Sequence, residues 1–169
     1  MKTVVYNEDL IKDVEIDETV TRVKGLFINS NNEIFLSCCE NVYQFPGGHL
    51  KEGETLEDGF KREIKEEIGI SLDKVDSPFL RITHLKRNYR NSGKNRQNDI
   101  YYYLVKTEEK PHLDKTNFDE YEALGNYKVE QIKLEEFKDK LYKNNLNNNE
   151  YLGLTKEMLT AYEEVLELI

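Results

Sequence analysis

The spacing of apolar residues divides the chain into strands and helices. Stretches rich in β-branched and aromatic residues predict strands, and apolar residues at every third or fourth position predict helices. The predicted strands are residues 19–29, 33–39, 43–45, 79–85, 99–105 and 126–133, and the predicted helices are residues 55–68, 134–141 and 151–169. Residues 1–17 are expected to form an N-terminal arm or an edge strand, and residues 143–150 a flexible turn or linker. This order of elements predicts a single α/β domain over residues 1–169.

The predicted helix over residues 55–68 has clear signals at both ends. Thr55 is a favourable N-cap, and Asp58 three residues later imitates a capping box. Gly69, just past the last apolar residue, is a common helix stop. Gly59 in the interior costs about 1 kcal/mol relative to alanine, so we expect a neighbour to pack closely there. One buried stripe is predicted from residues that recur every four positions, namely Leu56, Phe60, Ile64 and Ile68.

Three carboxylates lie beside that stripe. Glu63 precedes Glu66 and Glu67 by three and four residues, so at about 3.6 residues per turn we expect all three to converge. Arg62 can pair with Glu66, but one cation does not balance three anions. Magnesium and manganese prefer oxygen ligands, so the pattern predicts a metal site. The alternative is a solvated acidic helix face, which is common in a chain with 34% charged residues.

Residues 48–70 have the sequence GHLKEGETLEDGFKREIKEEIGI. This stretch resembles the signature of the Nudix hydrolases, G-x5-E-x7-R-E-U-x-E-E-x-G-U with U an apolar residue, and matches it at every fixed position. The predicted order of strand, strand, glycine loop and helix is also the layout of that family. The resemblance implies a Nudix-like α/β/α sandwich, in which a mixed β-sheet lies between helices.

The resemblance also implies an activity, which is hydrolysis of a nucleoside diphosphate linked to another group, with Mg²⁺ or Mn²⁺ as the cofactor. Arg62 would orient the carboxylates by ion pairing, and Glu54 would brace the loop against the helix. The implied metal ligands are the Gly48 carbonyl, Glu63, Glu66 and Glu67. A general base would take a proton from water. We favour Glu66 or Glu67, which lie within the signature stretch of residues 48–70, called the Nudix box below. The alternatives are Glu120 and Glu122 of a later loop.

The composition limits the partners of the chain. The net charge is −9, so the chain as a whole repels nucleic acid and anionic membranes. No apolar run approaches the length of a membrane span, and the N-terminus lacks the apolar region of a signal peptide. Cys38 and Cys39 are adjacent and predict buried thiols in a reduced compartment. We therefore expect a cytoplasmic protein that acts on a small molecule.

A basic stretch interrupts this acidic chain between two predicted strands. Its cations, with one acid at Asp99 against them, are Lys86, Arg87, Arg90, Lys94 and Arg96. We expect Arg87 and Arg90 to contact substrate phosphates and Tyr89 to stack on a base. The alternatives are a solvated hairpin loop and a surface for nucleic acid.

The substrate is expected to be nucleotide-like, first of all a nucleoside triphosphate. One alternative is an RNA 5′-end pyrophosphohydrolase, which only the basic stretch supports. Another is a Nudix-fold nucleotide sensor or regulator without catalysis, but such modules usually lose box carboxylates, and this chain keeps them. The apolar stripe of the C-terminal helix predicts either a core helix or a dimer contact, so the chain is expected to be a monomer or a homodimer.

Overall fold

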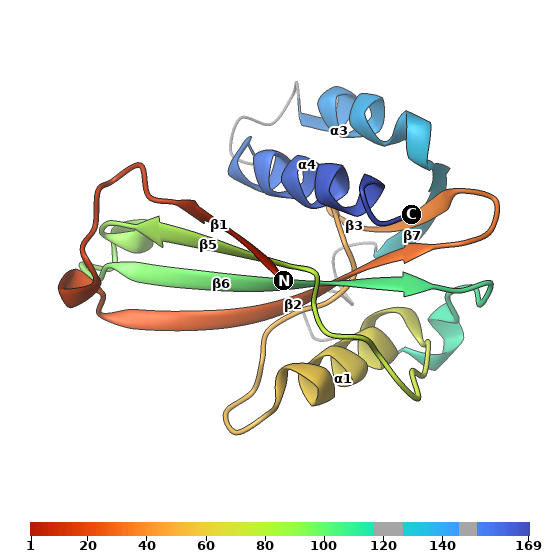
Figure 1. Cartoon of the computed structure of the whole chain (residues 1–169), viewed down its shortest axis with the longest axis horizontal. Coiled ribbons are helices and arrows are strands. Elements are labelled where there is room, and N and C mark those ends of the chain that lie inside the picture. The colour runs from red at the N-terminus through yellow and green to blue at the C-terminus, as the bar shows by residue number, and fades with distance from the viewer. Residues whose placement is uncertain (117–126, 146–151) are drawn as a thin grey trace.

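The computed structural model describes residues 1–116, 127–145 and 152–169, and in this part of the chain a seven-stranded sheet forms the middle layer. Helix α1 (Leu56–Ile68) covers one face of the sheet, and α3 (Phe137–Asn145) and α4 (Leu152–Leu166) cover the other (Figure 1). This arrangement confirms the predicted α/β/α sandwich with a mixed sheet.

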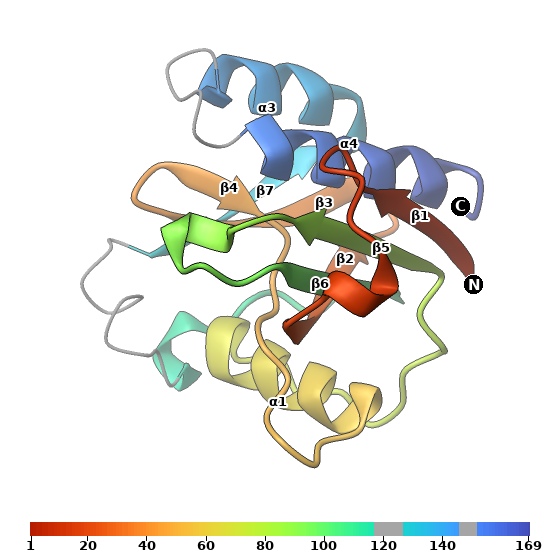
Figure 2. The same cartoon turned by 90° about the vertical axis from the view of Figure 1, so that its left-hand side faces the viewer.

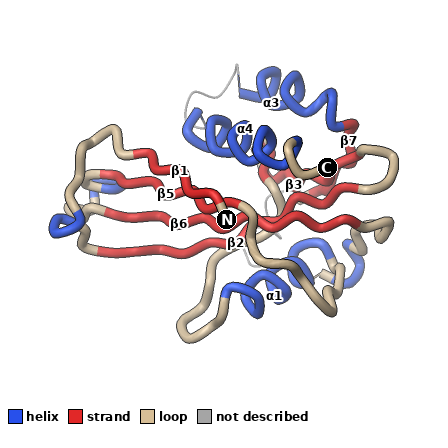
Figure 3. Tube along the Cα trace, viewed as in Figure 1, coloured by secondary structure: helices blue, strands red, loops and turns tan. Residues whose placement is uncertain are grey.

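The strands pair across long distances in sequence. They are β1 (Lys2–Tyr6), β2 (Glu18–Ile28), β3 (Glu33–Cys39), β4 (Val42–Gln44), β5 (Leu80–Lys86), β6 (Arg96–Lys106) and β7 (Lys128–Lys133). Their order is β1-β5-β6-β2-β3-β4, with β7 also paired to β3. The β1–β5 and β2–β6 pairs are parallel, and the other pairs are antiparallel. The N-terminal arm therefore contains an edge strand, as Figure 3 shows for the strand that carries the N-terminus.

The alternation of side chains along β2 supplies both hydrophobic cores. Val23 and Phe27 pack with Phe60 and Ile64 of α1. Leu26 and Ile28 belong to the other core, together with residues of α3 and α4, namely Phe137, Leu141, Met158, Ala161, Tyr162 and Val165. The stripe of the C-terminal helix is therefore mostly core, whereas Ile169 at its end is 46% exposed.

Helix α1 begins and ends where the local signals predict. The Thr55 side chain accepts a hydrogen bond from the Asp58 amide at 3.1 Å, and Gly69 adopts the left-handed conformation with φ 73°. A Cβ on Gly59 would clash with the Leu50 side chain. The close packing expected at this interior glycine is therefore confirmed.

The linker expected over residues 143–150 is partly wrong and partly outside the described residues. Residues 143–145 belong to α3 and not to a linker, because the helix continues past its apolar residues to Asn145. The rest of the expected linker lies outside the described residues. Cys38 and Cys39 are buried thiols, as expected. Among the helices described, none is both long and apolar enough to cross a bilayer.

Candidate functional site

A glycine loop, residues 45–54, connects β4 to α1 and lies against β2. Backbone amides of β2 donate to it, from Val23 to the Gly48 carbonyl at 3.0 Å and from Gly25 to the Pro46 carbonyl at 2.9 Å. Gly47 has φ +126°, and a Cβ on it would clash with the carbonyl oxygen of Val23. Only glycine therefore fits at this position, where the chain passes close to β2 on its way to α1.

Arg62 of α1 binds three carboxylates at once. Its Nε and Nη2 atoms donate to the two oxygens of Glu54 at 2.6 and 2.8 Å, which is a bidentate pair. Its Nη1 donates to Glu63 at 2.7 Å and to Glu66 at 2.8 Å. Its Nη2 also donates to the His49 carbonyl at 3.0 Å. We call Arg62, Glu54, Glu63 and Glu66 the Arg62 cluster; it ties the glycine loop to the helix.

The charge of Glu54 is strongly stabilised in this cluster. The Arg62 guanidinium and the Lys51 amide, which donates to Glu54 at 2.8 Å, lower the pKa of the Glu54 carboxyl from 4.5 to about 2. In return, hydrogen bonds to Glu54 and then to the other carboxylates raise the pKa of Arg62. The Arg62–Glu54 ion pair of the folded protein therefore persists until the pH falls towards about 2.

Glu54→Gln is expected to lower the free energy of unfolding at pH 7. The folded pKa of Glu54 is depressed, so its stabilisation is complete above the unfolded value near 4.5 and is lost as the pH falls towards about 2. The wild type should thus lose more stability than the variant over that window, which urea unfolding at pH 7, 4 and 3 measures. Glu52→Gln, at an exposed position of the same loop, is the matched control. Identical pH curves for the two variants would contradict the role of the Arg62–Glu54 pair.

Glu67 lies apart from the Arg62 cluster. Its side chain is 3% exposed and accepts a hydrogen bond from the Gly47 amide. Burial raises the pKa of the Glu67 carboxyl, and Lys24, the Gly47 amide and the hydroxyls of Tyr127 and Ser37 oppose that rise. Glu67 therefore holds the glycine loop from the side of the hydrophobic core.

The three carboxylates Glu63, Glu66 and Glu67 have different contacts in the structure. In the described part of the chain, no group of three or more His, Cys, Asp or Glu side chains is placed to hold a metal. Each residue turns the helix by about 100°, so Glu67 points within about 20° of Phe60 on the buried side, and Glu66 lies about 100° away from Glu67. Glu63 and Glu66 meet at one Arg62 nitrogen, whereas Glu67 meets Gly47.

The residues still fit a hard divalent cation in their chemistry. Glu63 and Glu66 are both within 2.8 Å of one Arg62 nitrogen, so one cation can reach both carboxylates. A Cβ on Gly48 would clash with the Glu63 carboxylate, so the glycine leaves room for this side chain beside the loop. The Gly48 carbonyl, another expected ligand, accepts the Val23 amide. All these donor atoms are oxygens, as magnesium and manganese prefer.

The basic stretch forms the hairpin between β5 and β6, at the end of the long strands that neither α1 nor α4 covers (Figures 1 and 2). His49 of the glycine loop bridges to Arg22 of β2, and the hairpin begins at the level of Glu18, which pairs with Arg96. Four residues of strand span about 13 Å. The structure therefore does not bring Arg87, Tyr89 and Arg90 to the Arg62 cluster.

Acidic residues of the N-terminal arm and of β2 pair with this hairpin. Arg87 pairs with Glu15 at 3.1 Å, and Arg96 pairs with Glu18 at 2.6 Å. The Arg96 guanidinium also lies 4.1 Å from the centre of the Tyr89 ring, and the Arg90 guanidinium 5.3 Å from it. The local charge that the sequence suggested is thus partly balanced by residues far away in the chain.

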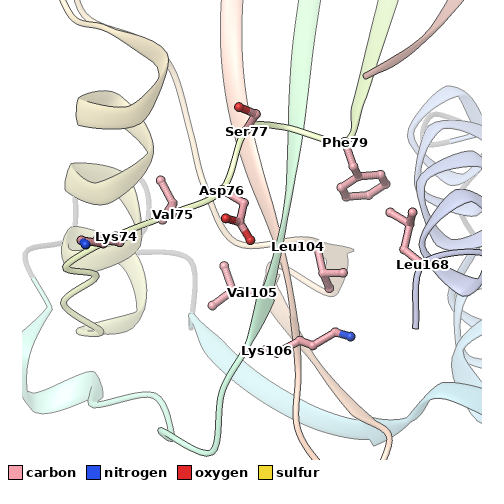
Figure 4. Close-up of a pocket in the computed structure, with 9 residues that line it drawn as sticks. All are labelled: Lys74, Val75, Asp76, Ser77, Phe79, Leu104, Val105, Lys106 and Leu168. Carbon is pink, nitrogen blue, oxygen red and sulfur yellow. The ribbon is translucent and has the colours of Figure 1, made fainter.

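The alternative general bases named from the sequence, Glu120 and Glu122, lie outside the described residues. On the other side of the sheet, His84 of β5 contacts Glu157 of α4 at 2.9 Å. A separate pocket of about 480 Å³ lies between the segment after α1, the end of β6 and Leu168, and no residue of the Nudix box lines it (Figure 4).

Lys24 and Gln44 were missed by the sequence reasoning. The Lys24 ammonium is buried and donates to the Gly47 carbonyl at 2.6 Å and to Gln44 Oε1 at 3.0 Å. Burial lowers the pKa of Lys24, and the charge of Glu67 is the largest effect that opposes it. The position of a charged residue between Val23 and the apolar run Leu26–Ile28 was the signal that could have identified Lys24.

Comparison with known proteins agrees with this fold. The model of the NUDIX domain family matches residues 20–145, and the chain therefore belongs to the NUDIX family. A stretch of 53 residues is 42% identical to the 8-oxo-dGTP diphosphatase of Escherichia coli strain K12, which is 28% of this chain and 41% of that protein. The match thus spans less than half of that relative.

Solved structures of MutT proteins share the fold. One, from work on MutT of Aliivibrio salmonicida and Vibrio cholerae, has a TM-score of 0.50 and 23% identity over 71% of this chain and 82% of that chain. The MutT protein of Bacillus halodurans has a TM-score of 0.50 and 17% identity over 71% of this chain and 72% of that chain. At such identities the likeness shows the fold alone.

Proposed function

We propose that the chain is a metal-dependent hydrolase that cleaves a pyrophosphate bond in a nucleoside diphosphate linked to another group. The observation that carries the proposal is the Arg62 cluster, in which one guanidinium holds Glu63 and Glu66 side by side and fixes the loop through Glu54. The membership of the NUDIX family supports the same reaction class.

Mg²⁺ or Mn²⁺ would be held by Glu63 and Glu66, with Glu67 and the Gly48 carbonyl as the further proposed ligands. When bound, such a metal supplies positive charge to the pyrophosphate oxygens and makes a water more acidic. Arg62 keeps the carboxylates in place, and Glu54 keeps Arg62 in place through its bidentate pair. Phosphoryl transfer needs mainly such positioning and charge stabilisation.

The proposed general base within the box is Glu66. Its side chain is 33% exposed, so it can meet a water, whereas Glu67 is 3% exposed and bonded to Gly47. Glu66 would accept the proton on the oxygen that Arg62 does not bind. Glu120 and Glu122 remain the alternative base.

The proposed substrate is a nucleoside triphosphate, including oxidised ones. The support for an oxidised base is the similarity of 53 residues to the 8-oxo-dGTP diphosphatase of Escherichia coli. Arg87, Tyr89 and Arg90 remain proposed contacts for a distant part of a long substrate, such as an RNA 5′ end. The non-catalytic sensor is less well supported, because Glu54, Arg62, Glu63, Glu66 and Glu67 are all present.

The test is a panel of nucleoside triphosphates, dinucleoside polyphosphates and 5′-triphosphate RNA with Mg²⁺, read by phosphate release and product masses. We expect release of pyrophosphate or phosphate that stops when the metal is chelated and returns with added Mg²⁺. Turnover that continues in excess chelator would disprove the metal mechanism. Tight nucleotide binding without any turnover would favour the sensor instead.

A further inference from the structure

Lys24 of β2 is a buried cation beside the proposed metal site. In the part of the chain that the structure describes, it is the only buried lysine or arginine, and Glu67 is one of two buried carboxylates. Along β2 it lies between Val23 and Gly25, on the strand that the glycine loop crosses. Nothing in the proposed reaction uses its charge, so its place requires an explanation.

Gly47 connects Lys24 to Glu67. The Gly47 carbonyl accepts a hydrogen bond from the Lys24 ammonium at 2.6 Å, and the Gly47 amide donates to the Glu67 carboxylate. Gln44 Oε1 accepts another hydrogen bond from the Lys24 ammonium at 3.0 Å. Two neutral oxygens and a nearby buried carboxylate therefore surround one positive charge.

These surroundings are the kind that a divalent metal prefers. Carbonyl, amide and carboxylate oxygens bind hard cations, and a buried carboxylate needs a cation near it because burial of an unpaired charge is costly. Arg62 is not the cation that pairs with Glu67, because the Arg62 nitrogens bind Glu54, Glu63 and Glu66. Lys24 is the basic group with which the Glu67 charge interacts most strongly.

We propose that Lys24 is an internal cation that competes with divalent metal at the Gly47–Glu67 end of the site. The ammonium neutralises Glu67 and keeps the Gly47 carbonyl engaged, so that metal binds most readily at Glu63 and Glu66. Lys24 thereby limits the number of metal ions that the site takes, or the affinity of the ion nearest Glu67. The inference rests on the proposed function. It assigns to Lys24 the role of limiting metal binding at the proposed site.

The experiment is a Mn²⁺ titration of the full chain, with free Mn²⁺ measured by electron paramagnetic resonance. Lys24→Met keeps the length of the side chain and removes its charge and donors, and Lys24→Gln removes the charge but keeps an N–H donor. Both variants should bind one additional Mn²⁺ ion, or bind Mn²⁺ about tenfold more tightly than the wild type. Lys24→Arg, which keeps the charge, should bind Mn²⁺ like the wild type.

A matched control is Lys61→Met on α1. Lys61 also donates to a backbone carbonyl, that of Asp73 at 2.7 Å, but pairs with Glu57 at the start of the helix. Its replacement should leave Mn²⁺ binding unchanged. A gain of Mn²⁺ affinity in this control equal to that in Lys24→Met would show a general effect of net charge and overturn the inference.

The other outcomes are equally decisive. Unchanged or weaker Mn²⁺ binding in both neutral variants would show that Lys24 only positions the loop, and the inference would be wrong. A neutral variant that folds only with Mn²⁺ would support it, because the metal then replaces the ammonium. Neutral variants that stay unfolded at saturating Mn²⁺ would contradict it. A wild type that binds no Mn²⁺ would refute the proposed function itself, and the inference with it.

Discussion

Replacing Glu66 with glutamine should lower the turnover number by at least about a hundredfold, which corresponds to about 2.7 kcal/mol of activation barrier. The change keeps the size of the side chain and removes the charge that is proposed to hold the metal and accept a proton. The fold should be unchanged, because Glu66 is 33% exposed and its ion pair with Arg62 is an i,i+4 pair on a helix. Such pairs contribute about 0.3–0.5 kcal/mol.

The matched control for this variant is Glu57→Gln. Glu57 lies on the same helix and forms an i,i+4 pair with Lys61 at 2.7 Å, outside the Arg62 cluster. Steady-state kinetics and thermal unfolding should show an activity within about threefold of the wild type and a similar melting temperature. If Glu66→Gln also keeps its turnover within threefold, the Arg62 cluster is not the reaction centre.

Replacing Gly47 with alanine should both destabilise the protein and abolish most of its activity. Gly47 has φ +126°, a conformation that other residues avoid, and the added Cβ would meet the backbone carbonyl of Val23. Backbone atoms of a central strand cannot move aside as a side chain can. The loop would shift, and the bonds from Gly47 to Lys24 and Glu67 would weaken. We expect a loss of about 3 kcal/mol of unfolding free energy and more than tenfold in turnover, measured by urea unfolding and kinetics.

Gly53→Ala separates the cost of backbone strain from the cost of a steric clash. Gly53 also has a positive φ, of +80°, but no atom lies near the position of its added Cβ. This control should cost only the strain of the left-handed conformation, about 1–2 kcal/mol, and should leave turnover unchanged. Equal losses in the two alanine variants would mean that the contact with Val23 does not matter.

The parts of the fold that were predictable from the sequence depend on local interactions. Thr55 and Gly69 mark the ends of α1 because caps act within one turn of the helix. Gly59 predicted a close neighbour because an interior glycine is costly without one. The parallel β1–β5 pair and the β3–β7 pair join segments far apart in the chain. Local patterns contain no information about such partners.

The same distinction between local and long-range interactions applies to the candidate site. The roles of Glu54 and Arg62 came from the family resemblance, and the geometry of their pair agrees with those roles. The separation of Glu67 from Glu66 could have been worked out from the angle between successive helical residues. The place of Lys24 could not, because it depends on the glycine loop lying against β2.

The charge of the hairpin was misjudged for a related reason. Its arginines were counted against acids nearby in sequence, but Arg96 pairs with Glu18, which is 78 residues away. Arg87 pairs with Glu15 across a similar separation. A charged stretch can therefore be assessed only together with the segments that fold against it.

The glycine loop has a consequence for how the protein can be altered. The ladder between β2 and β3 is confined to Ile28 and Ile34, so farther along, β2 would have an open edge. The loop closes that edge, because its Gly48 and Pro46 carbonyls accept from the Val23 and Gly25 amides of β2, and its Leu50 amide donates to β2 in return. Open edges of sheets invite pairing with other chains. Insertions into this loop would thus expose a site for aggregation, whereas the exposed tip of the β5–β6 hairpin can accept a tag or a longer turn.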